Sequence, residues 1–123
     1  MKHIIKDTLL LIGMQPNLLG FSYIVYAEEI LLENKSSFPY LIKDIYKRIS
    51  EKYNTTSSAV ERCIRHAISV TWSCITTEET TKIRQKLFST TKKCSKNVPT
   101  NSQFIFRLYF YFIDSNESYT IEF

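Results

Sequence analysis

Apolar side chains recur at three- and four-residue intervals between residues 57 and 73, and this pattern is the clearest along the chain. Such spacing places them on one face of an α-helix, because successive residues turn by about 100°. The opposite face carries arginine, histidine and serine side chains. The pattern therefore predicts a helix with one side in a core and the other in solvent. Its predicted core face consists of Val60, Ile64, Ala67, Ile68 and the methyl group of Thr71.

Polar residues 54–58 precede this helix and supply its start. The hydroxyl groups of Thr56, Ser57 and Ser58 are all suited to capping, because each can accept a hydrogen bond from a first-turn N–H. Ser58 together with Glu61 has the spacing of a capping box. We therefore expect the N-terminal cap at one of these three residues. The spacing of Ser58 and Glu61 favours a capping box.

A second amphipathic segment lies just before, at residues 38–53, with a proline near its start and an apolar stripe from Leu41 to Tyr53. Proline suits the first turn of a helix, where its missing N–H costs nothing. The break that follows has no glycine, but Asn54 can adopt the left-handed conformation that such a turn requires. The two segments predict a helix-turn-helix over about 40–73.

The remaining periodic segments predict an all-α fold of about six helices. One domain over residues 1–114 is expected, followed by an irregular tail at 115–123. The apolar run at 103–113 would also suit a strand, because it is rich in aromatic residues; we expect a helix there. The further predicted helices cover residues 3–13, 18–33, 77–87 and 99–113.

Specific side chains are expected inside and outside this bundle. In the helix over 18–33, we expect Glu28, Glu29 and Glu33 to face outward. In the helix over 77–87, acidic residues come first and Lys82, Arg84 and Lys86 follow, an order that complements the helix dipole. The residues predicted to be buried around the helix-turn-helix are Leu41, Ile45, Ile49, Val60, Ile64, Ile68 and Trp72.

The charge is unevenly distributed along the chain. The formal net charge is +4, but residues 40–98 alone hold twelve lysines and arginines against five acidic residues. A basic segment that coincides with a helix-turn-helix indicates a polyanionic partner. The outer face of the helix over 57–73 suits the DNA major groove, because arginine can bridge two guanine acceptors and glutamate can accept from cytosine. An ordinary solvated surface helix would show the same residues.

The sequence offers little material for catalysis or metal binding. Only two histidines are present, and no Gly-rich phosphate loop or metalloprotease motif occurs. The three cysteines are odd in number and have no metal-binding spacing, so free thiols in a reducing cytoplasm are expected. We expect no enzyme activity, no cofactor, no metal site, no targeting peptide and no membrane span.

The stretches YNTTSSAVERCIRHAISVTW at 53–72 and PTNSQFI at 99–105 resemble the C-terminal DNA-binding effector domain of the master sporulation response regulators of endospore-forming Firmicutes. A fainter similarity covers residues 4–30. The resemblance implies an all-helical bundle that binds double-stranded promoter DNA. Those regulators carry a receiver domain in front of the effector domain, and here Met1 lies a few residues before the similar region, so we expect a stand-alone domain.

The resemblance also implies roles for individual residues. Base-facing positions correspond to Glu61 and Arg62, and positions near the DNA backbone to Arg65 and His66. The serines at the helix start are candidates on their chemistry, because they leave room for close approach and can donate to phosphate: Ser58 is expected to face the bases and Ser57 a phosphate. A basic loop at 88–98 adds candidate phosphate contacts at Lys92, Lys93 and Lys96, although a solvated loop is equally consistent with its composition. One departure concerns specificity: the family has an arginine two residues before the glutamate, and this chain has Ala59.

Two functions follow from these observations. The first is a sequence-specific DNA-binding transcription regulator that reads the major groove with the helix at about 57–73. The second is a non-enzymatic interaction module that pairs with, or antagonises, a full-length sporulation regulator, or forms a homodimer. Ala59 and the apolar C-terminal helix favour the second function, whereas the basic middle segment favours the first.

Overall fold

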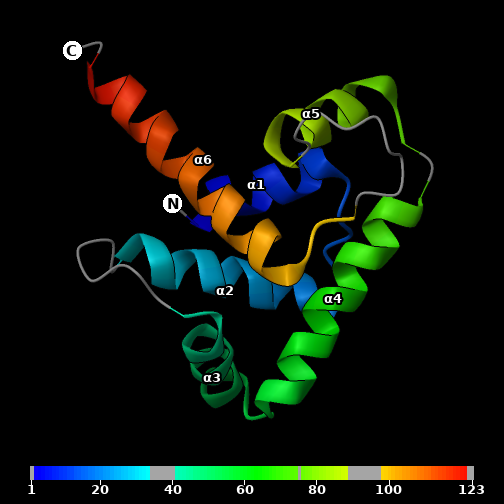
Figure 1. Cartoon of the computed structure of the whole chain (residues 1–123), viewed down its shortest axis with the longest axis vertical. Helices are drawn as coiled ribbons and strands as arrows, with labels where there is room; N and C mark the ends of the chain where they lie inside the picture. Colours follow the sequence, from blue (N-terminus) through cyan, green and yellow to red (C-terminus); the bar gives the residue numbers. More distant parts are fainter. Residues whose placement is uncertain (1, 34–40, 75, 89–97, 122–123) are drawn as a thin grey trace.

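The computed structural model describes residues 2–33, 41–74, 76–88 and 98–121, with side chains described as far as residue 114. Within these residues the secondary structure is entirely helical, which confirms the all-α prediction. Figure 1 shows the bundle that the helices form. They are α1 (Lys2–Ile12), α2 (Leu19–Glu33), α3 (Ile42–Tyr53), α4 (Ser57–Ser73), α5 (Glu78–Phe88) and α6 (Asn101–Ile121).

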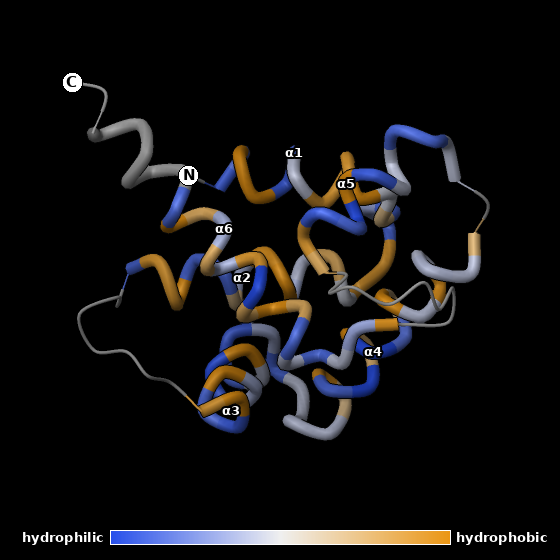
Figure 2. Tube along the Cα trace, turned by 45° about the horizontal axis from the view of Figure 1, so that its top comes forward, coloured by the Kyte–Doolittle hydropathy of each residue, from blue (hydrophilic) through white to orange (hydrophobic). Residues whose placement is uncertain are grey.

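Helix α2 is the central element, because it packs against α1, α3, α4 and α6. It is also the most continuously apolar helix, and most of its residues are buried. A helix that is apolar around much of its circumference needs neighbours on several sides. Figure 2 shows hydrophilic residues along the outer sides of α3 and α4, whose apolar sides face α2 and each other.

Several helix ends follow from single residues. Gly13 has a φ of 101°, and the N–H groups of Gly13 and Met14 bond to the carbonyls of Leu10 and Leu9, which is a Schellman motif. Asn54 ends α3 in the left-handed conformation, at φ 56° and ψ 53°, as the sequence predicts. Left-handed residues at these two positions let the chain turn sharply into the next segment.

The start of α6 is fixed by a capping box. The hydroxyl of Thr100 accepts from the N–H of Gln103, and the side-chain oxygen of Gln103 accepts from the N–H of Thr100. The helix then runs to Ile121, so the expectation of an irregular tail from residue 115 is wrong for residues 115–121. Neither glycine nor proline occurs in this stretch, so no strong helix-ending signal interrupts it.

The predicted core is mostly confirmed. Five of its members, Ile45, Ile49, Val60, Ile64 and Ile68, are at most 1% exposed. The prediction that Leu41 is buried is wrong, because this residue is 63% exposed. It precedes α3 in an extended conformation and so does not continue the apolar stripe of the helix. Trp72 is only partly buried, and its ring makes edge contacts with Phe88 and Phe104.

Glu28 is the largest departure from the sequence prediction. It was expected to face outward, but it is 0% exposed. Neither of its carboxylate oxygens has a hydrogen-bond partner among the described residues. Burial raises the pKa of Glu28 well above its ordinary value of 4.5, since the charged form is poorly solvated there. Because α2 has neighbours on several sides, even a residue off its main apolar stripe is enclosed.

Candidate nucleic-acid interface

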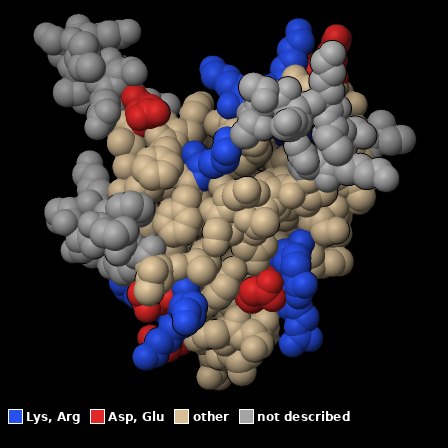
Figure 3. All heavy atoms as spheres, in the orientation of Figure 1, with Lys and Arg blue, Asp and Glu red and all other residues tan. Residues whose placement is uncertain are grey.

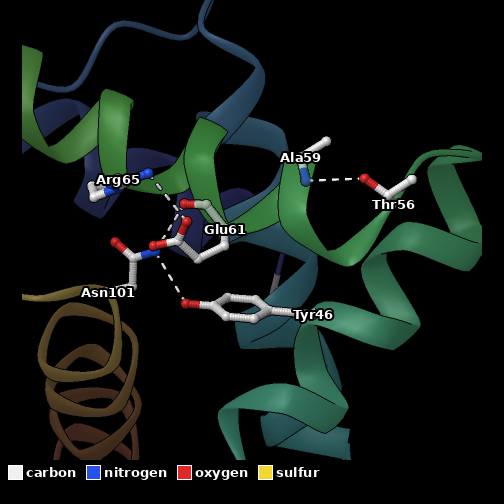
Figure 4. Close-up of polar contacts among 6 residues, drawn as sticks. All are labelled: Tyr46, Thr56, Ala59, Glu61, Arg65 and Asn101. Carbon is white, nitrogen blue, oxygen red and sulfur yellow. Dashed lines mark hydrogen bonds and ion pairs between the residues drawn. The ribbon is translucent and has the colours of Figure 1, made fainter.

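Helix α4 begins with a hydroxyl cap at Thr56, whose Oγ1 accepts a hydrogen bond of 3.1 Å from the N–H of Ala59 (Figure 4). The predicted box of Ser58 and Glu61 does not form, because Ser58 already lies inside the helix. The Glu61 carboxylate instead lies 3.2 Å from the guanidinium of Arg65, one turn further along α4. Of the three hydroxyl groups predicted as possible caps, the first in the chain, that of Thr56, caps α4.

The sequence-predicted site residues on α4 lie together on its outward side. Ser57, Ser58, Arg62, Arg65 and His66 are all exposed. Glu61 is at the flank, and its side chain is 40% exposed. On the face shown in Figure 3, lysine and arginine side chains lie over the region of α3 and α4, with acidic side chains beside them. The three candidate loop residues, Lys92, Lys93 and Lys96, lie outside the described residues.

The Glu61–Arg65 ion pair leaves the arginine available. The Arg65 side chain is 58% exposed, and an exposed pair four residues apart in a helix contributes only about 0.3–0.5 kcal/mol. An incoming anion can therefore separate the two side chains at small cost. The pair keeps the guanidinium on the outer face without fixing it there.

One flank of α4 is held by a side chain that the sequence analysis did not single out. The amide nitrogen of Asn101, the first residue of α6, donates to the backbone carbonyl of Glu61 and to the hydroxyl of Tyr46, both at 3.0 Å (Figure 4). Asn101 is 8% exposed. Burial raises the pKa of Tyr46, and the hydrogen bond from Asn101 offsets part of this effect. Asn101 therefore joins α3, α4 and α6.

The other flank of α4 lies against the start of α2. A side chain at Gly20 would place its Cβ 2.5 Å from the carbonyl oxygen of Cys63 and 2.6 Å from the Cβ of Ala67. Real Cβ atoms do not approach so closely, so only glycine allows this crossing. The two helix backbones are therefore in close contact at this point, and the residues just before Gly20 stand beside the outer face of α4.

A groove of about 800 Å³ opens where these two segments meet. One side is formed by residues 17–20, from the turn between α1 and α2 and the start of α2, and the other by the outer face of α4. Arg62, Arg65 and His66 lie along the second side, and the residues that line the groove include no acid. Ala59 contributes only a methyl group to it.

The far end of α4 is held by Arg84, whose role the charge pattern did not predict. Its Nε donates to the carbonyl of Ile12 at 2.8 Å and its Nη2 to the carbonyl of Thr71 at 2.9 Å. The guanidinium also lies over the ring of Trp72, 4.9 Å from its centroid. Burial lowers the pKa of Arg84, which remains a cation at neutral pH. This side chain links α1, α4 and α5.

The described part of the chain has no grouping of metal-ligating side chains and no membrane-spanning helix. There, no three histidine, cysteine or acidic side chains are grouped so that they could hold a metal ion. In the same residues, no helix has the length and apolar character needed to cross a bilayer.

Residues 5–111 match the family described as sporulation initiation factor Spo0A C terminal. This range contains all the described helices except the first residues of α1 and the end of α6.

Proposed function

Since the chain belongs to the family of sporulation initiation factor Spo0A C-terminal domains, a family of DNA-binding transcription regulators rather than enzymes, we propose that it binds double-stranded DNA with α4 in the major groove. The observation that carries this proposal is the outer face of α4. Three cationic or titratable side chains, Arg62, Arg65 and His66, are exposed on it in one contiguous row.

Two kinds of contact are assigned along this face. Ser58, Glu61 and Arg62, near the start of the helix, contact base edges. Arg62 is suited to guanine because its two donors match the two guanine acceptors, and Glu61 is suited to the amino group of cytosine. These contacts carry the sequence preference, whereas contacts to the backbone fix position and orientation.

The phosphate contacts are assigned to Ser57, Arg65 and His66. The hydroxyl of Ser57 and the backbone N–H groups of Ser57 and Ser58, in the first turn of α4, can donate to phosphate oxygens. Lys92, Lys93 and Lys96 are proposed as additional contacts on charge alone. Arg65 leaves Glu61 at small cost, so its transfer to a phosphate does not depend on breaking a strong internal bond.

Binding across a salt series tests the proposal. The affinity for duplex DNA with a TGTCGAA-type box, the box implied by the family resemblance, is compared with that for a scrambled duplex by fluorescence anisotropy. If phosphate contacts drive binding, log affinity falls with log salt by about 0.9 per phosphate neutralised. Arg62→Ala is expected to reduce the preference for the box. Lys82→Ala, which removes an exposed cation from α5, serves as the control.

A second function is favoured by the surface of α6. Phe110 is 50% exposed and Tyr111 is 38% exposed, although the helix also buries Phe104, Leu108 and Phe112. Exposed aromatic residues in a row suit protein contacts. This favours pairing with a second copy or with a homologous regulator. A concentration series in light scattering tests it: a constant monomer mass up to high concentration would exclude a homodimer.

A further inference from the structure

We infer that the turn between α1 and α2 is a second wall of the DNA site, so that one DNA strand runs between this turn and α4. The inference rests on the proposed function and extends it to residues outside the helix-turn-helix. The residues assigned to this wall are Asn17 and Leu19. Neither belongs to α3 or α4, and both line the groove.

The geometry of the crossing places this wall. Gly20 brings the backbone of α2 into contact with Cys63 and Ala67 of α4. The residues immediately before Gly20 cannot lie far from the same helix, and they line the groove with Arg62 and His66 on its other side. The turn is therefore a fixed neighbour of the surface that is proposed to contact DNA.

The exposure of Leu19 and Asn17 supports a role for them in contacting DNA. Leu19 is 63% exposed, which is the largest exposed fraction, shared with Leu41, among the exposed large apolar residues of the described part. Asn17 is also exposed. A leucine side chain on the rim of a cationic groove matches the apolar parts of a DNA strand, namely the deoxyribose carbons and the thymine methyl group. The amide of Asn17 can donate to a phosphate oxygen.

The charge of the groove identifies an anionic occupant. Arg62, Arg65 and His66 line it, and no acidic residue does, although Glu61 beside the groove forms an exposed ion pair with Arg65. An uncharged ligand would cover the guanidinium group of Arg62 without pairing it, which is costly. A nucleic-acid strand supplies both the phosphates and the apolar sugar edges.

Charge reversal on the turn tests this inference. In Leu19→Glu, a carboxylate would lie among the phosphates of the bound strand, so we expect affinity for box and scrambled duplexes alike to fall about tenfold. The fall should shrink as salt is raised, since screening weakens the repulsion. Asn17→Asp changes only an amide to a carboxylate of the same shape, and it should act in the same direction.

The matched control is Ile4→Glu, which adds the same charge at an apolar residue that is 45% exposed in the first turn of α1, outside the groove. Leu19→Glu and Asn17→Asp should both lose more affinity than Ile4→Glu. If both match Ile4→Glu while Arg62→Ala still weakens binding, the inference is overturned and the proposed function stands. If the wild type shows no salt-dependent affinity for DNA, both are overturned.

Discussion

Asn101 and Glu61 are 40 positions apart in the chain, and the side-chain amide of the first donates to the backbone carbonyl of the second at 3.0 Å. The same amide nitrogen donates to Tyr46. The proposed base-facing residue Glu61 is therefore held through its backbone by the first residue of α6. The position of α4 therefore depends on α6, which lies outside the helix-turn-helix.

The first prediction concerns this contact. Asn101→Ala removes both hydrogen bonds and leaves a partly buried carbonyl and hydroxyl without that donor, so the free energy of unfolding should fall by about 1–3 kcal/mol. Urea denaturation measures the change. Tyr46→Phe removes one of the two bonds and keeps the ring, so a smaller loss is expected. Equal stability of Asn101→Ala and wild type would show that the contact contributes nothing.

The second prediction concerns Glu28 and pH. In the unfolded chain this carboxyl ionises near pH 4.5, whereas burial keeps it protonated in the folded chain to a much higher pH. Above pH 4.5 the native state thus binds more protons than the unfolded state. The free energy of unfolding should fall as pH rises, by at most about 1.4 kcal/mol per pH unit, until the folded carboxyl ionises.

Glu28→Gln should remove this part of the pH dependence, because the amide does not titrate. The measurement is urea denaturation of both proteins between pH 4 and pH 8, and the variant should gain relative stability as pH rises. Glu33→Gln is the control, since Glu33 is exposed at the end of the same helix. A constant difference between Glu28→Gln and wild type across this range would contradict the protonated state.

The third prediction concerns Arg84. Lysine keeps the charge but cannot donate in two fixed directions to Ile12 and Thr71 while also lying over the ring of Trp72. Arg84→Lys should therefore lower the free energy of unfolding by about 1–3 kcal/mol. Thermal or urea denaturation provides the value. Lys86→Arg, the reverse exchange at an exposed position of α5, should change stability by less than about 0.5 kcal/mol.

The fourth prediction concerns Ala59 and sequence preference. Residue 59 lines the groove, and its methyl group is too short to reach a guanine edge. Ala59→Arg should raise the preference for the TGTCGAA-type box over a mutated box by about 1–3 kcal/mol. The fold should be little affected, because arginine is a good helix former. Competition binding with both duplexes measures the effect, and identical discrimination by the two proteins would show that residue 59 does not face the bases.

The helical fold could be predicted from the sequence because local signals agreed with it. Periodic apolar residues defined the helices, and Gly13 and Asn54 marked two helix ends. Burial predicted from the apolar stripe was less reliable near the ends of helices. Leu41 continues the apolar spacing in the sequence, but it lies before the first turn of α3. Short-range spacing cannot show where a helix begins to within one residue.

Long-range contacts could not be predicted. Glu28 was expected in solvent because it is charged, and only the neighbours of α2 explain its burial. Arg84 and Asn101 carry no local signal for their roles, because their partners lie 72, 13, 55 and 40 positions away. The groove likewise depends on the crossing of α2 and α4 at Gly20, which residue spacing within one helix does not reveal.

The attachment of α6 has a thermodynamic consequence for the two candidate functions. The helix that carries the exposed side chain of Phe110 begins at Asn101, which holds α4, the helix proposed to contact DNA. A partner that displaces Asn101 on binding would release α4 and weaken DNA binding. By thermodynamic linkage, bound DNA would then lower the affinity of the protein for that partner by the same factor. DNA and a protein partner could therefore compete without binding to the same surface, because both depend on the position of α6.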